Sequence, residues 1–228
     1  MDPALVSLIA ACIAFVGSHF ALSHPLRAPL VRALGERPFL GLYTLVAFLT
    51  LGWIVLAFRA APADIGGAPG PAGDVLWAAA SLLTIVALVL LFGSFRGNPA
   101  VPETPAEKVA AAAPRGIFAV TRHPMMWAFA LWAIAHMLIF WSTRTMIVAA
   151  AILLLALLGA HLQDRKKRAL QGEAWAHWEA QTSYWPRWSG LLSAGWGLWL
   201  AAILLWLAIT WLHLWLAGLP AGIWRWAG

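Results

Sequence analysis

Residues 121–137, with the sequence TRHPMMWAFALWAIAHM, join a basic, proline-containing turn directly to an apolar stretch. The turn carries Arg122 and His123, and the apolar stretch that follows Pro124 carries a second histidine, His136. Ionisable side chains inside a membrane span are costly, so each needs a partner or a function. This stretch therefore predicts a membrane helix that carries a functional histidine site.

The composition is that of an integral membrane protein. Hydrophobic residues make up 62% of the chain, charged residues make up 11%, and the mean hydropathy is +0.79. A soluble domain carries about 25% charged residues, so this chain has too little polar surface to cover a globule in water. The net charge of +6 indicates basic loops against anionic lipid, and no nucleic-acid partner is expected. Cys12 is the only cysteine, which excludes an intrachain disulfide.

Apolar stretches of the length that crosses a bilayer, about 20 residues, recur along the whole chain. They predict an all-α fold, a polytopic transmembrane bundle of five to six spans, as a single domain over residues 1–228. The Gly/Pro/Ala-rich residues 60–73 are expected to form a flexible outer connector. The predicted spans are residues 3–22, 39–58, 75–95, 125–141, 145–162 and 195–217.

Most of the 15 Lys and Arg residues fall in the alternate loops 23–38, 96–124 and 163–194. The positive-inside rule places these loops in the cytoplasm and the N-terminus in the periplasm of a bacterial inner membrane. In the last of these loops, Trp175 and Trp178 recur at helical spacing. This pattern predicts a cytoplasmic interfacial helix in addition to the spans.

Histidines on several predicted spans are the candidate functional residues. His19, His123 and His161 fall near the cytoplasmic ends of three spans and could converge in one leaflet. His136 lies 13 residues beyond His123, about 20 Å along a helix, so depth favours His123 as the neighbour of His19. Neutral imidazole ligates haem iron and other metals, whereas hydrogen bonds between helices are the alternative role for such residues. No Cys-x-x-Cys-His motif is present, which excludes a covalent c-type haem.

A set of short motifs, taken together, resembles the pattern of NnrU-type membrane proteins over about residues 14–188. They are LGERPFLGLYTLV at 34–46, GSH at 17–19 with Arg27, TRHPM at 121–125, LWAIAH at 131–136, DRK at 164–166, GEAW at 172–175 and TS at 182–183.

This resemblance implies a haem protein. NnrU proteins are associated with denitrification and nitric-oxide metabolism, and they are similar to zeta-carotene isomerases, which bind haem b through histidines in membrane helices. Carried over to this chain, the resemblance implies that His19, with either His123 or His136, ligates the haem iron. It also implies an isomerase-like activity on an apolar small molecule or a role in nitrogen-oxide metabolism.

Arg122-His123-Pro124 also resembles the isoprenylcysteine and phospholipid methyltransferases, in which Arg-His-Pro and a downstream Glu pair surround S-adenosylmethionine. That likeness implies a lipid or prenyl methyltransferase with Arg122 at the cofactor. The adjacent Glu-Glu is absent, and only Glu173 and Glu179, six residues apart, remain. A third hypothesis is a non-enzymatic membrane factor or permease, in which the histidines serve packing or proton movement.

Overall fold

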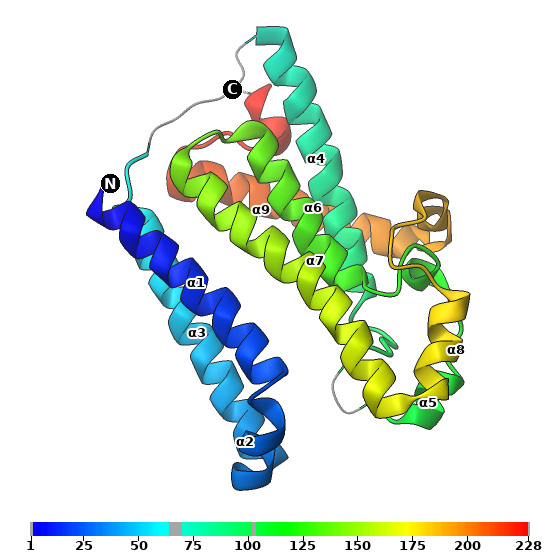
Figure 1. Cartoon of the computed structure of the whole chain (residues 1–228). Helices are drawn as coiled ribbons and strands as arrows, with labels where there is room; N and C mark the ends of the chain where they lie inside the picture. Colours follow the sequence, from blue (N-terminus) through cyan, green and yellow to red (C-terminus); the bar gives the residue numbers. More distant parts are fainter. Residues whose placement is uncertain (1, 64–69, 102–103, 228) are drawn as a thin grey trace. The chain divides into compact units, whose positions relative to one another are not determined.

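The protein is described by a computed structural model that covers residues 2–63, 70–101 and 104–227, and these residues contain no β-strand. Five of their helices are long and apolar enough to cross a membrane, which confirms the predicted all-α polytopic architecture (Figure 1). They are α1 (Pro3–Ser23), α3 (Glu36–Ala60), α4 (Gly70–Gly93), α7 (Thr143–Gln171) and α9 (Trp196–Ala217).

Shorter elements connect these helices, and the sequence predicted two of them. The predicted interfacial segment forms α8 (Glu173–Gln181), and the predicted span at 125–141 forms α6 (Pro124–Ile139). At 16 residues, α6 is about 24 Å long, less than the roughly 30 Å hydrocarbon core of a bilayer. The unpredicted elements are α2 (Arg27–Leu34), α5 (Ala106–Ala110) and the 3₁₀ turns η1 (Gly116–Ala119), η2 (Trp188–Ser193) and η3 (Gly222–Arg225).

Two predicted boundaries differ from the structure. The predicted end of the fifth span at residue 162 is wrong, because α7 continues to Gln171. The basic run at 165–168 therefore lies on the last turns of a 29-residue helix and not in a loop. Of the predicted outer connector at 60–73, residues 64–69 lie outside the described part, and α4 already begins at Gly70.

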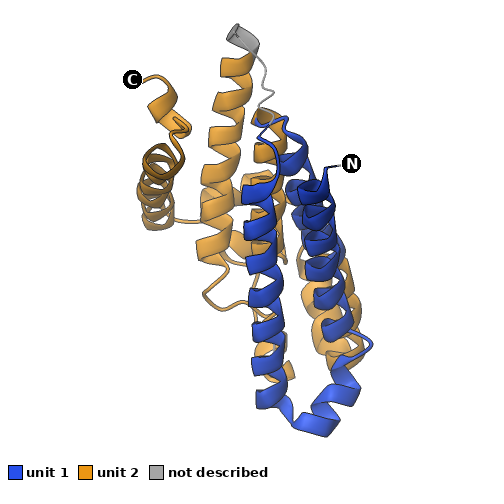
Figure 2. Cartoon of the chain, turned by 90° about the vertical axis from the view of Figure 1, so that its left-hand side faces the viewer, with its two compact units in different colours: residues 1–67, 140–159 blue, residues 68–139, 160–228 orange. Residues whose placement is uncertain are grey.

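The chain divides into two compact units (Figure 2). Unit 1 comprises residues 1–67 and 140–159, and unit 2 comprises residues 68–139 and 160–228. Helix α7 begins in unit 1 and ends in unit 2. The expectation of a single domain over the whole chain stays a prediction.

In unit 1, α1 packs along α3 (Figure 1). Cys12 and Ala57 are buried in this contact, as close helix packing in a membrane requires. Arg144, on the first turn of α7, donates hydrogen bonds to the carbonyl oxygens of Phe58 and Ala61, at 3.3 and 3.1 Å. Its guanidinium therefore satisfies backbone acceptors at the C-terminal end of α3, where a positive charge is favourable.

In unit 2, α4 packs along α6 and against α9. Buried tryptophans tie these elements together because an indole N–H in an apolar environment needs an acceptor. Trp206 of α9 donates to Thr84 Oγ1 of α4 at 2.9 Å, and Trp77 of α4 donates to the carbonyl oxygen of Gly222 at 3.0 Å. The candidate site lies in this unit, where α6, α7 and α8 are linked by polar contacts.

Candidate functional site

The turn that precedes α6 is set by the His123-Pro124 step. Proline suits the first turn of a helix, because its missing N–H is not needed there, and it keeps the preceding residue out of helical geometry. The backbone carbonyl of His123 accepts the first helical hydrogen bond from the N–H of Trp127 at 3.0 Å. The N–H of His123 donates to Thr121 Oγ1 at 3.2 Å. The sequence thus fixes Arg122 and His123 at the entrance to α6.

The segment that follows α8 is hydrogen-bonded to this turn. The backbone N–H of Arg122 donates to the carbonyl oxygen of Ser183 at 2.9 Å. The carbonyl oxygen of Tyr184 accepts from the Thr121 hydroxyl and from the Trp127 indole N–H, both at 2.8 Å. Two segments about 60 residues apart in sequence therefore hold each other in place.

Asp164 of α7 binds both functional side chains of the turn. Its Oδ1 atom accepts from Nε2 of His123 at 2.8 Å, and its Oδ2 atom accepts from Nε and Nη2 of Arg122 at 2.9 and 2.6 Å. The exposed fractions of the side chains are 0% for His123, 5% for Asp164 and 12% for Arg122. A buried carboxylate of this kind requires a paired cation, and Arg122 supplies it.

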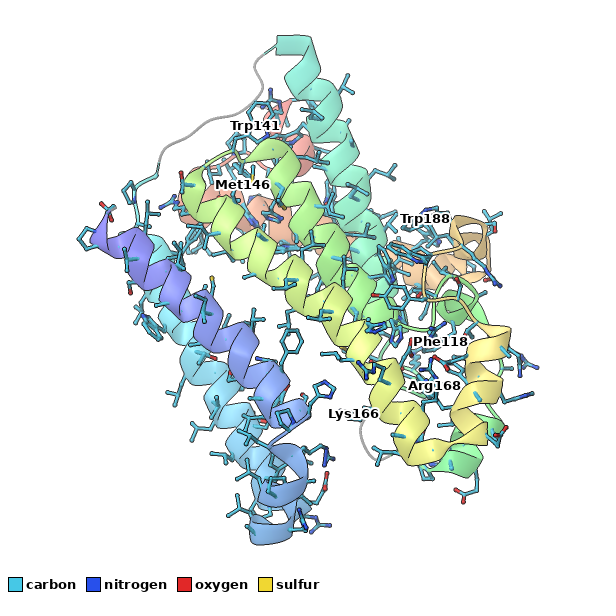
Figure 3. The ribbon with its side chains drawn as sticks, viewed as in Figure 1. Phe118, Trp141, Met146, Lys166, Arg168 and Trp188 are labelled. Atoms are coloured by element: carbon cyan, nitrogen blue, oxygen red, sulfur yellow. The ribbon has the colours of Figure 1, made fainter. Side chains whose placement is uncertain are left out.

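Glu179 of α8 extends the charged network to a second arginine. Its Oε1 atom lies 3.5 Å from Nη2 of Arg122, and its two carboxylate oxygens accept from Nη2 and Nε of Arg168 at 2.6 and 2.7 Å. The labelled Arg168 lies between α7 and α8 in Figure 3. The network thus contains two guanidinium groups and two carboxylates, so its formal charges balance when the imidazole is neutral.

Aromatic rings continue from the buried histidine to the surface. The ring of Tyr184 lies 5.7 Å from that of His123 and 5.5 Å from that of Trp185, between centroids. Trp185 also contacts Trp127, at 5.4 Å, and is 65% exposed. Burial raises the pKa of the Tyr184 hydroxyl above its ordinary value, and the Asp164 carboxylate raises it further.

The second ring nitrogen of His123 is not used by Asp164. Its Nδ1 atom is buried and has no hydrogen-bond partner among the residues that the structure describes. Buried polar atoms are nearly always hydrogen-bonded, and an exception calls for a partner such as water or a ligand.

A second polar surface of α7 holds the segment that precedes α5. The side chains of Gln163, Lys167 and Gln171 follow one another at four-residue spacing, so they share one face of the helix. Lys167 is buried, and each of the three donates to a backbone carbonyl of this segment. The acceptors are Ala100, Val101 and Thr104, at 2.9, 2.9 and 2.7 Å respectively.

A family model described as NnrU protein matches residues 7–221. The chain belongs to the NnrU family. The match includes all four predicted site residues and extends to α9, which the resemblance noted from the motifs did not cover. No curated protein and no solved structure matches the chain.

The structure of this NnrU protein brings two of the predicted site residues together, Arg122 and His123. His136 lies on α6, and its Nδ1 donates to the carbonyl oxygen of Trp132 at 2.8 Å. His19 lies on α1 in unit 1. His161 is exposed on α7. The roles of His19, His123 and His136 as ligands stay predictions.

Sequence reasoning missed Asp164 and Tyr184 as members of the site of this NnrU protein. Among the sequence motifs, Asp164 appears only in DRK at 164–166, without a role of its own. A signal was available, because Asp164 is the single acid next to four basic residues at the predicted end of the span. An Arg-His pair at the neighbouring helix entrance needs a counter-charge at that depth. Nothing in the sequence indicates that the Tyr184 carbonyl would bind Thr121.

Proposed function

We propose that this NnrU protein binds haem b in the membrane and that His19 would be a ligand of the haem iron. The bound haem would supply the chemistry for a reaction of a nitrogen oxide or for the isomerisation of an apolar polyene. The family's association with nitric-oxide metabolism and its likeness to zeta-carotene isomerases support these two reactions. The hydrogen bond made by the His19 ring supports the assignment of His19 as a ligand of the haem iron.

The orientation of the His19 ring is the observation that carries the proposal. Its Nδ1–H donates to the carbonyl oxygen of Phe15 at 2.7 Å. Histidines that ligate metals typically donate their other ring N–H to a carbonyl or carboxylate, which fixes the tautomer. Here that hydrogen bond leaves Nε2 as the ligating atom. The rings of Phe15 and Tyr43, at 4.3 and 5.5 Å between centroids, give the imidazole an aromatic surrounding.

Haem suits the donor set better than a bare metal ion. Among the described residues, no group of three or more His, Cys, Asp or Glu side chains could hold a metal ion. Haem iron needs one or two protein ligands, because the porphyrin supplies the others. The bound haem would supply redox chemistry and a site for small molecules. The chain would contribute ligation, orientation and exclusion of water.

Two residues could supply a second ligand to the haem iron. His136 has the same ring geometry as His19, since its Nδ1 donates to the carbonyl four residues before it. His123 directly precedes α6, at the end of that span that is predicted to be cytoplasmic. His19 is also predicted to lie near the cytoplasmic end of its span. However, the Nε2 atom of His123 already donates to Asp164. Separate spectra of the His123→Ala and His136→Ala variants would assign the second ligand.

Absorption spectra of the detergent-purified protein, oxidised and reduced, test the haem proposal. We expect a Soret band in the wild type and its loss in His19→Ala. The matched control is His213→Ala, because His213 lies on a membrane helix and its Nδ1 also donates to a carbonyl four residues earlier, at 2.7 Å. A colourless wild-type protein, after expression with ample haem, would overturn the proposal. An unchanged spectrum in His19→Ala would overturn the assignment of the ligand.

Methyl transfer from S-adenosylmethionine is the alternative that the Arg-His-Pro motif suggests. The contacts of the motif do not favour it, because Arg122 is engaged by Asp164 and Glu179 is engaged by Arg168. Saturable binding of S-adenosylmethionine, weakened by Arg122→Ala, would support the alternative. Absence of both haem and S-adenosylmethionine binding would favour a non-enzymatic membrane factor or permease.

We also propose that the chain lies in a bacterial inner membrane with its basic segments in the cytoplasm. The excess of Lys and Arg in alternate loops supports this orientation. A maleimide reagent that does not cross membranes tests it, because Cys12 is the only native cysteine and is buried. In a Cys12→Ala background, a cysteine at Arg165 should react only after the cells are opened. Labelling of that position in intact spheroplasts would overturn the orientation.

A further inference from the structure

The His123–Asp164 pair leaves one polar atom of the site unexplained, and that atom points to a ligand. The Nε2 atom of His123 is fully used by Asp164, at 2.8 Å. Asp164 is itself held by Arg122, so the ring cannot turn over without breaking a charged hydrogen bond in a buried place. The Nδ1 atom therefore has a fixed direction, and it is buried without a partner among the described residues.

The protonation pattern of the ring defines which partner Nδ1 needs. When Nε2 carries the proton that Asp164 accepts, the Nδ1 atom of a neutral imidazole presents a lone pair. Its missing partner is then a hydrogen-bond donor, such as an O–H group. Asp164 and Tyr184 contact the ring, and the network continues from Asp164 through Arg122 and Glu179 to Arg168. In this network the two carboxylates offset the two guanidinium groups. A charged ligand would disturb this balance, whereas a neutral hydroxyl would not.

The surroundings of the ring indicate what the rest of the ligand resembles. From His123, the rings of Tyr184 and Trp185 lead outward to an exposed indole, with Trp127 beside them. These rings place apolar surface beside the His123 ring, whose Nδ1 is an unsatisfied acceptor. An amphiphile with a hydrocarbon body and one hydroxyl group has the matching chemistry.

We infer that Nδ1 of His123 accepts a hydrogen bond from the hydroxyl group of a neutral ligand with an apolar body, which the Tyr184–Trp185 rings contact. Asp164 acts as a positioning residue that aims this atom. The inference goes beyond the haem proposal and does not depend on it, since it uses only residues of unit 2. The same O–H chemistry could come from an internal water, so the experiment has to separate the two sources.

A pair of matched probes and one matched variant test the inference. The probes are 1-dodecanol and dodecane, which differ in the hydroxyl group, added at equal mole ratios to the purified full-length protein in detergent. The variant is His123→Gln, because the glutamine amide reaches the position of Nε2 and can still donate to Asp164 but places no atom at Nδ1. The readout is the melting temperature of the protein.

We expect 1-dodecanol to raise the melting temperature of the wild type by about 2 to 4 °C more than dodecane does. In His123→Gln the difference between the two probes should vanish, which corresponds to roughly tenfold weaker alcohol binding. Equal effects of both probes on the wild type, or the same alcohol effect in both proteins, would exclude an amphiphile that binds at Nδ1.

The internal-water source is tested on the same protein without added alcohol. A high-resolution density map with an ordered water within hydrogen-bonding distance of Nδ1 would identify water as the O–H donor. The nitrogen NMR shift of selectively labelled His123 provides a measurement that needs no variant, because a hydrogen bond to Nδ1 changes it. Absence of an alcohol effect on the wild type would overturn the inferred amphiphile, and an ordered water at Nδ1 without such an effect would assign the O–H donor to water instead.

Discussion

Nε2 of His123 lies 2.8 Å from Oδ1 of Asp164, and this contact joins the entrance of α6 to the C-terminal part of α7. Arg122 binds the other oxygen of the same carboxylate at 2.6 Å. Two consecutive residues thus share one acidic partner about 40 positions later in the chain. A single acidic side chain therefore organises the candidate site of unit 2.

The Asp164→Asn variant tests this organising role. The amide has no charge to offset Arg122, and removing one partner of a buried ion pair costs about 3 to 5 kcal/mol. We expect the free energy of unfolding, measured by denaturation in mixed micelles, to fall by about that amount. Glu173→Gln is the control, because Glu173 is exposed at the start of α8. A loss of under about 1 kcal/mol in Asp164→Asn would show that the pair contributes little.

The two arginines of the network should respond differently to replacement by lysine. Arg122 is 12% exposed and donates from Nε and Nη2 to the Asp164 carboxylate, so the compact ammonium of lysine cannot reproduce its contacts. Arg168 is 53% exposed, where an ion pair contributes at most about 1 kcal/mol. We expect Arg122→Lys to lower the melting temperature clearly and Arg168→Lys to change it little. Equal effects of the two variants would contradict the burial argument.

Gly190 of η2 marks a close approach of two backbone segments. A Cβ atom at this position would lie 2.7 Å from the carbonyl carbon and oxygen of Ala119 in η1, and backbone cannot yield as a flexible side chain can. We expect Gly190→Ala to destabilise the protein by about 1 to 3 kcal/mol. The matched control is Gly197→Ala on α9, where nothing lies within 4 Å of the added atom. That change should leave stability unchanged or raise it by up to about 1 kcal/mol.

The raised pKa of Tyr184 predicts a loss of stability in alkaline solution. Below about pH 10, the ordinary pKa of tyrosine, the hydroxyl is neutral in both the folded and the unfolded chain. Above it, the unfolded chain ionises more readily than the folded one, so the free energy of unfolding falls as pH rises through the folded pKa. Tyr184→Phe should remove this component above about pH 10. If the free energy of unfolding fell with pH in the same way in the wild type and in Tyr184→Phe, this prediction would be contradicted.

The spans were predictable because hydropathy and length set them, and proline steps set several of their ends. The end of α7 could not be predicted, because charged residues normally end a membrane span. Here Asp164 and Lys167 stay helical because each binds a partner within the protein. Of the site, the Arg122-His123 step could be found by its place before Pro124. The pairing of Thr121 with Tyr184 could not, because no local pattern in the sequence links residues 63 positions apart.

The haem content of the protein purified from cells supplied with a haem precursor tests the central proposal most directly. We predict a haem-to-protein ratio near one for the wild type and for His213→Ala, and a ratio near zero for His19→Ala. A wild-type protein that is folded and membrane-inserted but contains no haem would contradict the proposed function.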